Sequence, residues 1–255
     1  MQSLYKLVFS ILAAVVFYTS IPLPHRWQLD FSRISRWAPL IGIFIGLLIS
    51  IFDFSLGQIG VPNLTRSALV VAIWIALTGG LHLDGAMDTA DGLAILDSER
   101  RLEVMADSVS GAFGVMAALV IVLLKTCALS DLVTDRYFIL VFAAGWGRWA
   151  QVLAIGLYPY LKAEGKGAFH KQGIKVPQDI LLGAGLLVSI SALWLVWDFT
   201  RWWLPVITTV EGSVISWLTG AWFHRKLGGH TGDTYGATVE WTETLILCLL
   251  TFVVS

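Results

Sequence analysis

Long, nearly uninterrupted apolar blocks dominate this chain and restrict it to a membrane protein built from helices. Of its 255 residues, 56% are hydrophobic and only 14% are charged, whereas ordinary globular domains carry about 25% charged residues. An apolar block of about 18 or more residues is long enough to cross a bilayer as an α-helix. The sequence therefore predicts an all-α, polytopic integral membrane bundle that forms a single domain over residues 1–255.

Eight segments are candidates for crossing the membrane. The third and the last are short, so the sequence predicts seven or eight spans. We expect the third segment to run on as a helix into the polar stretch after it. We expect the first to be an uncleaved helix, because no small-residue cleavage site follows it. The candidate segments are residues 4–21, 38–56, 67–81, 113–129, 138–157, 180–197, 203–223 and 244–254.

The distribution of basic residues predicts which side of the membrane is cytosolic, because cytosolic loops are enriched in Lys and Arg. If the eight segments alternate, eleven basic residues fall on one side and four on the other. Two more, Lys125 and Arg148, fall within spans. The basic side also holds the three longest polar segments, residues 82–112, 158–179 and 224–243. We therefore expect these segments to form helical loops on the cytosolic side.

The first polar segment carries three aspartates, Asp84, Asp88 and Asp91, spaced four and three residues apart. On an α-helix these positions fall within an arc of about 60° and form one stripe. Like charges at this spacing repel one another, and a divalent cation would offset the repulsion. Oxygen ligands favour Mg²⁺ or Mn²⁺ over Zn²⁺. A solvated acidic face is the alternative, but the apolar, glycine-rich flanks make it the weaker one.

A second stretch, residues 100–114, follows the aspartates and carries Arg100 and Asp107. Its apolar residues form a narrow stripe, which predicts a short interfacial helix that ends at Asp107. Asp107 is either a helix N-cap or a fourth carboxylate of the metal site. Arg100 is either a residue that sets the topology or a phosphate contact.

A third stretch again has a Gly-Gly pair and a His before its acids, Asp233 and Glu240, which lie seven residues apart. Two acidic helix starts on the same side of the membrane indicate one shared site. Thr231 and the neighbouring glycine amides suit phosphate oxygens. The basic, glycine-rich loop at residues 164–171, which contains Lys166, suits an anionic substrate. For both stretches a plain polar loop is the alternative interpretation.

Together these stretches resemble the cobalamin synthase family, the adenosylcobinamide-GDP ribazoletransferases. The run GGLHLDGAMDTADG at residues 79–92 resembles the most characteristic motif of that family, and GGHTGDTYGATVE at residues 228–240 resembles its second. The residues MADS and GAFG within 105–114 and the proline turn within 18–24 match in order. The sequence departs from the family at Ser20, where we expect Arg.

The resemblance implies that adenosylcobinamide-GDP is joined to α-ribazole, or to α-ribazole 5′-phosphate, with release of GMP. It implies a Mg²⁺-dependent, multi-pass enzyme of the bacterial inner membrane with its active face in the cytosol. In this interpretation the metal ligands are Asp84, Asp88, Asp91 and Asp107. The catalytic carboxylates are Asp84, Asp88, Asp91 and Asp233, one of which is the base. The residues expected to contact substrate are His82, Arg100, Lys166, Thr231 and Glu240.

Two other functions compete with this interpretation. Residues 88–94 begin like the DxxDGxxA motif of CDP-alcohol phosphotransferases, but Ile95 stands where that motif continues with Arg. A divalent-cation or vitamin permease needs ionisable residues near the middle of the bilayer, and only Lys125 and Arg148 qualify. We expect these two to make hydrogen bonds between helices. The partners expected are the two substrates and membrane lipid, and the sequence leaves a homo-oligomer open. A net charge of -1 gives no reason to expect nucleic acid.

Overall fold

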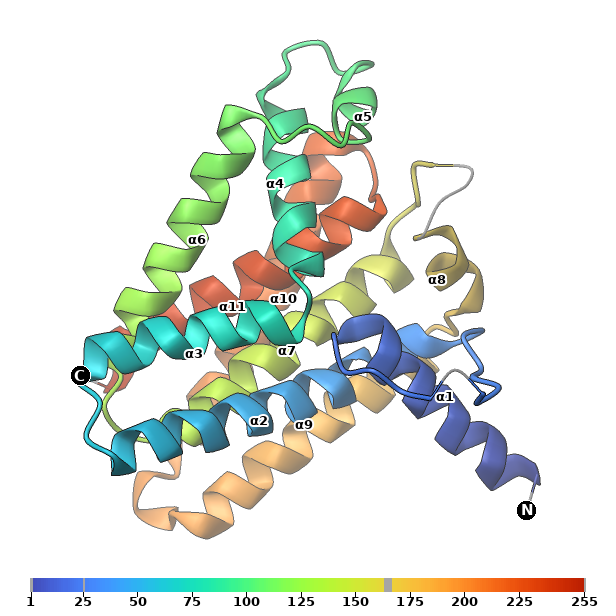
Figure 1. Ribbon diagram of the computed structural model, residues 1–255. Helices are drawn as coiled ribbons and strands as arrows, with labels where there is room; N and C mark the ends of the chain where they lie inside the picture. The colour runs from blue at the N-terminus through green and yellow to red at the C-terminus, as the bar shows by residue number, and fades with distance from the viewer. Residues whose placement is uncertain (1, 25, 163–166, 255) are drawn as a thin grey trace.

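The computed structural model describes residues 2–24, 26–162 and 167–254, with side chains from residue 5 onward. Within these ranges every regular element is a helix (Figure 1), which confirms the predicted all-α class. The elements are α1 (Gln2–Tyr18), η1 (Ile34–Trp37), α2 (Ala38–Gln58), α3 (Asn63–Leu77), α4 (Leu81–Ala94), α5 (Arg101–Val104), α6 (Ala112–Asp131), α7 (Arg136–Leu157), α8 (Ala168–Gly173), α9 (Gln178–Trp197), η2 (Phe199–Arg201), α10 (Trp203–Leu227) and α11 (Gly232–Val254).

Five helices in the described part of the chain are long and apolar enough to cross a membrane. They are η1 with α2, then α6, α7, α9 and α11, and the pair α3 and α4 makes a sixth if it is counted as one broken span. The chain is thus multi-pass by length and composition, but the expected seven or eight spans are not confirmed. Two further helices are not among these candidate spans. Helix α1 is too short, with 17 residues, and α10 is long enough, with 25 residues, but is less apolar.

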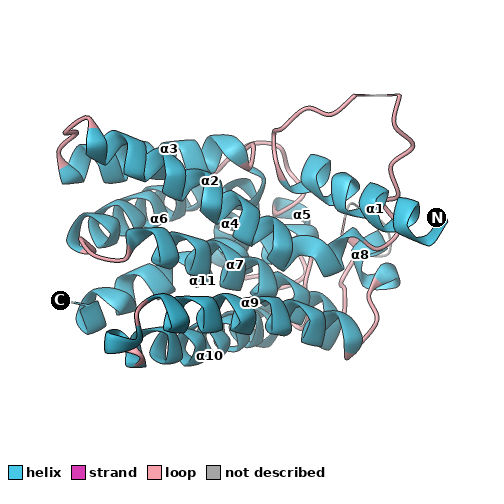
Figure 2. Ribbon diagram, turned by 90° about the horizontal axis from the view of Figure 1, so that it is seen from below, coloured by secondary structure: helices cyan, strands magenta, loops and turns pink. Residues whose placement is uncertain are grey.

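Helix α7 forms the centre of the bundle. Nearly all of its side chains are buried, and it packs against α2, α9, α10 and α11 (Figure 2). Large apolar side chains such as Phe142 and Trp146 fill the space around it. Apolarity does not explain this position, because α7 has the lowest mean hydropathy of the five candidate spans, 1.5. Its charged side chains Arg136 and Arg148 can lie inside because they pair with Asp53 and Glu243 of neighbouring helices.

The third predicted span does not run straight on into the acidic stretch, so this expectation was wrong. The chain turns by 90° between α3 and α4. Gly79 and Gly80 form the turn with φ of 60° and 68°, a left-handed conformation that glycine adopts without a Cβ clash. As a result α4 lies across the end of α3, beside α6 and α11 (Figure 1). Taken alone, α4 is not among the membrane-crossing helices.

The last predicted span, residues 244–254, is the second half of a much longer helix. Helix α11 begins at Gly232 and has 23 residues, so the second acidic motif and the last span are one continuous element. The interfacial helix expected up to Asp107 is shorter than predicted, because α5 has only 4 residues and ends at Val104.

The three polar segments meet at one end of the bundle. Arg101, the first residue of α5, donates a hydrogen bond from Nη1 to the carbonyl oxygen of Lys226 at the end of α10 (3.2 Å). The loops before α8 and before α11 are joined by two backbone hydrogen bonds, from Leu161 to His230 (2.8 Å) and from His230 to Pro159 (2.9 Å). The acidic helix α4 and the start of α11 therefore belong to the same end.

Candidate active site

Two glycines allow α4 and α11 to pack with their backbones in contact. A Cβ on Gly85 would lie 2.6 Å from the carbonyl oxygen of Asp233, and one on Gly236 would lie 3.0 Å from that of His82. Contacts this short exclude any side chain unless the helices separate. The close approach brings Asp233 against the turn of α4 between Asp84 and Asp88. The two acidic motifs therefore lie side by side, as the sequence predicted, and a shared site remains a prediction.

The carboxylates of this acidic cluster (Asp84, Asp88 and Asp233) are at least partly open to solvent. Asp84 is exposed, while Asp88 and Asp233 are half-buried. Burial, followed by the charges of Asp84, Asp233 and Asp91, raises the pKa of Asp88 to about 6. Burial and neighbouring negative charges thus both disfavour the ionised form of Asp88.

Lys162 is a member of this site that the sequence analysis missed. Its Nζ lies 3.2 Å from Oδ2 of Asp233, and the same oxygen accepts a hydrogen bond from the hydroxyl of Thr231 (3.1 Å). The backbone pairing of Leu161 with His230 holds Lys162 there. From the sequence, Lys162 was only one of many basic residues on the cytosolic side, because nothing local indicates that pairing.

Asp91 lies at the buried end of the stripe and has structural partners. Its two carboxylate oxygens accept backbone hydrogen bonds from Gly111 (2.7 Å) and Gly114 (2.8 Å) at the start of α6. A carboxylate at a helix N-terminus satisfies amides that have no partner within the helix. Asp91 thus fixes α6 against α4, although the sequence placed it in the metal site on equal terms with Asp88.

Glu240 is buried in the bundle rather than open to a substrate. Its Oε2 lies 2.6 Å from Nζ of Lys125 on α6, and Lys125 lies equally close to Oε2 of Glu243. Arg148 on α7 completes this buried ion network with a contact of 2.8 Å to Glu243. The network confirms the expectation that Lys125 and Arg148 bond between helices. It gives Glu240 a structural role, whereas the sequence suggested substrate contact.

The remaining predicted residues have varied positions. His82 is buried, and the centre of its ring lies 6.2 Å from that of Tyr18. Burial lowers the pKa of His82 well below the usual value. Thr231 caps the N-terminus of α11, because its hydroxyl oxygen accepts a hydrogen bond from the backbone amide of Thr234 (3.3 Å). Asp107 is exposed, and its Oδ1 accepts a hydrogen bond from the backbone amide of Val109 (3.1 Å). Arg100 is exposed. Lys166 lies outside the described residues.

The acidic cluster meets the ligand requirements of Mg²⁺ only in part. In the described ranges no three His, Cys, Asp or Glu side chains lie close enough together to hold a metal ion by themselves. Mg²⁺ usually binds through one or two carboxylates and takes its other ligands from water and substrate phosphates. Asp84 and Asp88 supply such hard oxygens at an accessible place. The acidic cluster thus has the kind of donor that Mg²⁺ accepts, and the ion's other ligands would have to come from water or phosphate oxygens.

Comparison with known proteins assigns the chain to a family. The family model for cobalamin-5-phosphate synthase matches residues 10–251. The chain belongs to this family. The adenosylcobinamide-GDP ribazoletransferase of Trichormus variabilis is 56% identical over 245 residues, covering 96% of this chain and 97% of its own. That of Synechocystis sp. is 47% identical over 247 residues, covering 96% and 95%. No solved structure matches the chain.

Membership of the cobalamin-5-phosphate synthase family decides among the three functions that the sequence left open. The match extends over nearly the whole chain, whereas the CDP-alcohol phosphotransferase motif was incomplete. The family match thus favours the transferase.

Replacing Gly85 by alanine tests the close contact between the two acidic helices. The new Cβ must push α4 away from Asp233, and misplacing catalytic groups by about 1 Å costs about 100-fold in rate. We expect transferase activity to fall at least about tenfold, measured as product formed per folded protein. Gly185→Ala on α9 is the matched control, because nothing lies within 4 Å of its added Cβ. Equal activities of the two variants would contradict the arrangement.

Proposed function

We propose that this chain joins adenosylcobinamide-GDP to α-ribazole, or to α-ribazole 5′-phosphate, and so completes the nucleotide loop of adenosylcobalamin. A ribose hydroxyl attacks the phosphorus that carries the corrinoid, the bond to GMP breaks, and GMP leaves with the electron pair. The family match supports the reaction. Phosphoryl transfer depends mainly on positioning and charge neutralisation. The observation that carries the assignment of the site is the packing of Asp233 on Gly85 between two further aspartates.

The proposal gives each residue of the cluster a role. Asp84 and Asp88 would hold a Mg²⁺, which would supply neutralisation of the negative charge of the diphosphate. Asp233 accepts the proton of the attacking hydroxyl. Lys162, 3.2 Å from Asp233, contacts a phosphate oxygen. Asp91 is a positioning residue, since its oxygens are bonded to the amides that start α6.

The same proposal includes a location, a multi-pass protein of the bacterial inner membrane with the acidic cluster in the cytosol. The support is the excess of basic residues on the side of the three polar segments, eleven against four. We propose that α1, α3 and α10 cross the membrane in addition to the five longer apolar helices. Adenosylcobinamide-GDP is a large substrate and needs an open site. The acidic cluster at the membrane surface, where Asp84 is exposed, provides one.

Release of GMP by the purified protein tests the function. Protein treated with EDTA is given adenosylcobinamide-GDP and α-ribazole, with and without Mg²⁺, and GMP is measured by chromatography. We expect release only when Mg²⁺ and α-ribazole are both present. Release without the acceptor would indicate hydrolysis instead, and no release from folded protein would overturn the assignment.

The rate of GMP release should depend on pH through Asp88. Its raised pKa of about 6 means that the carboxyl is protonated below that pH, and only the ionised form binds a metal. At limiting Mg²⁺ we expect activity to fall as the pH is lowered through about 6. Because Mg²⁺ competes with the proton, saturating Mg²⁺ should move the midpoint to lower pH. A midpoint that does not respond to Mg²⁺ would show that Asp88 holds no metal.

A further inference from the structure

An apolar groove lies on the side of α4 that faces away from the acidic cluster. On an α-helix, Ala86, Ala90 and Leu93 lie opposite the stripe that contains Asp84 and Asp88. The groove has a volume of about 450 Å³, within the range of about 300–1,000 Å³ typical of ligand sites. Its walls come from α4, α6, α10 and α11. The body of α4 thus separates the groove from the proposed reaction.

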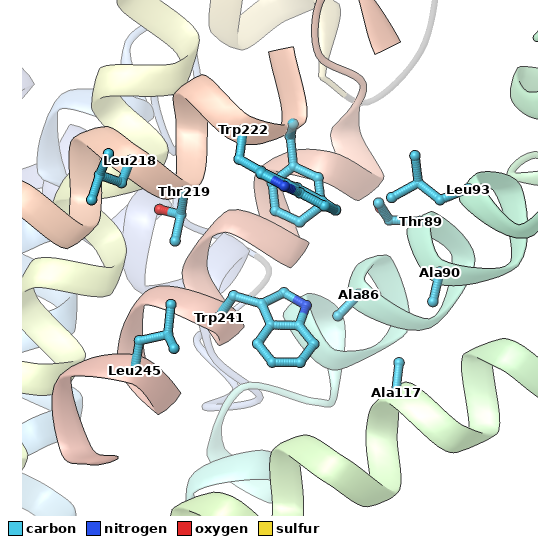
Figure 3. A pocket seen from close by; sticks show the side chains of 11 residues that line it. Ala86, Thr89, Ala90, Leu93, Ala117, Leu218, Thr219, Trp222, Trp241 and Leu245 are labelled. Atoms are coloured by element: carbon cyan, nitrogen blue, oxygen red, sulfur yellow. The ribbon is translucent and has the colours of Figure 1, made fainter. Parts of the chain in front are cut away.

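Large aromatic rings face small side chains across the groove. Figure 3 shows the indole rings of Trp222 and Trp241, which come from α10 and α11. Ala86, Ala90 and Ala117 line the groove on α4 and α6. Because the alanines leave the space open and the indoles supply broad apolar walls, the groove suits a hydrocarbon ligand.

The hydroxyl groups that line the groove are already hydrogen-bonded. Thr89 donates to the carbonyl oxygen of Gly85 (2.6 Å). Thr219 bonds to the carbonyl oxygen of Ile215 (2.9 Å) and shares a contact of 2.7 Å with the hydroxyl of Thr242. A polar ligand in the groove would lose its bonds to water and find few new ones, which is unfavourable. The ligand that fits is therefore apolar.

The groove is open along α10 and α11, where apolar side chains are exposed. Leu218 and Trp222 are each 49% exposed, and Leu245 is 37% exposed. Since α11 is one of the membrane-crossing helices, this side faces the hydrocarbon of the bilayer. Acyl chains can enter the groove from there directly, whereas a water-soluble substrate would have to pass through lipid.

Basic side chains lie at the polar end of the groove. Nζ of Lys226 lies 5.7 Å from the centre of the Trp222 ring, and Arg225 is its exposed neighbour at the end of α10. Among the described residues neither side chain takes part in a salt bridge. An apolar groove with unpaired cations at its polar end is complementary to a lipid that has an acyl chain and an anionic headgroup.

We propose that this groove binds one acyl chain of an anionic phospholipid, with the headgroup against Lys226 and Arg225. The proposal rests on the membrane location given above, but not on the reaction. The bound acyl chain packs against α4 on the side opposite Asp88 and supports the position of this helix against α11. Bound lipid is thereby a structural partner of the acidic cluster.

Photo-crosslinking in reconstituted bilayers tests the proposal. Phosphatidylglycerol and phosphatidylcholine probes carry the same acyl diazirine, and labelled peptides are mapped by mass spectrometry. We expect the anionic probe to label the groove at least about fivefold more than the zwitterionic probe, because even one basic residue near a membrane surface has an effect of that size. At Leu193 and Val196, exposed apolar residues of α9, the two probes should label equally.

Two sets of variants make the test specific. Ala117→Phe fills the groove and should lower its labelling several-fold, whereas Val120→Phe should not, because Val120 is exposed on the same helix outside the groove. Replacing Arg225 and Lys226 together by glutamine should remove the preference for phosphatidylglycerol but keep labelling of the groove. These readouts need no transferase activity, so an inactive preparation leaves the test intact.

Two results would overturn the proposal. Equal labelling of the groove and α9 by both probes, unchanged in Ala117→Phe, would mean that only unspecific boundary lipid is present. Displacement of the probe from the groove by free α-ribazole would assign the groove to the substrate instead.

Discussion

Replacing Asp88 by asparagine is expected to reduce GMP release at least about 100-fold, the usual effect of removing one preorganised electrostatic group from an active site. Asparagine has the same shape but cannot carry the charge that binds Mg²⁺. Burial, together with the charges of Asp84 and Asp233, raises the pKa of Asp88, so its ionised form is unfavourable in the folded protein. The neutral variant should therefore be at least as stable as the parent at neutral pH. Lost activity with unchanged or higher thermal stability is a combination that misfolding does not produce.

The measurement compares GMP release and thermal unfolding in detergent for the parent, Asp88→Asn and a control. Asp97→Asn is the matched control, because Asp97 is exposed in the loop after α4, where it accepts the amide of Glu99 (3.0 Å). It should keep full activity. If Asp88→Asn kept more than about a tenth of the parent rate, Asp88 would not be part of the catalytic site.

Replacing Lys125 by methionine should have the largest effect on stability. Its Nζ lies 2.6 Å from oxygens of both Glu240 and Glu243, and all three side chains are buried. The substitution leaves two carboxylates with only Arg148 as a positive partner. Breaking a buried ion pair in this way costs about 3–5 kcal/mol. We expect a large fall in the midpoint of thermal unfolding, measured in detergent.

A second substitution separates charge balance from loss of packing. In Lys125→Met with Glu240→Gln, Arg148 remains paired with Glu243, so the network is neutral again. This double variant should recover much of the stability lost in Lys125→Met, since the unpaired buried charge dominates the cost. If the double variant were no more stable than Lys125→Met, the network would contribute mainly through packing.

The fold class and the location of the acidic site followed from local properties of the sequence. Apolar blocks require a nonpolar environment whatever their neighbours are, so the helical membrane bundle could be predicted from them. The spacing of Asp84 and Asp88 depends only on the geometry of one helix, which exists as α4. The repeated motif around Asp233 predicted that the two acidic stretches lie together, and the contact at Gly85 shows that they do.

The partners of individual side chains depended on contacts between distant segments. Asp91 and Glu240 look from the sequence like further site residues, yet one caps α6 and the other pairs with Lys125. Lys162 reaches Asp233 because two loops pair through their backbones. A carboxylate bonds to whichever donor the fold brings near it, and spacing along one helix does not reveal that donor.

The sequence by itself determined that this chain is a helical membrane protein with acidic motifs at one end, because hydropathy and helical spacing are properties of each segment alone. Only the tertiary structure decided that α4 turns by 90° at Gly79 and Gly80. A glycine pair permits a left-handed turn without requiring it, and packing against α6 and α11 selects it. That turn aligns one face of α4 with Asp233 and the other with the apolar groove.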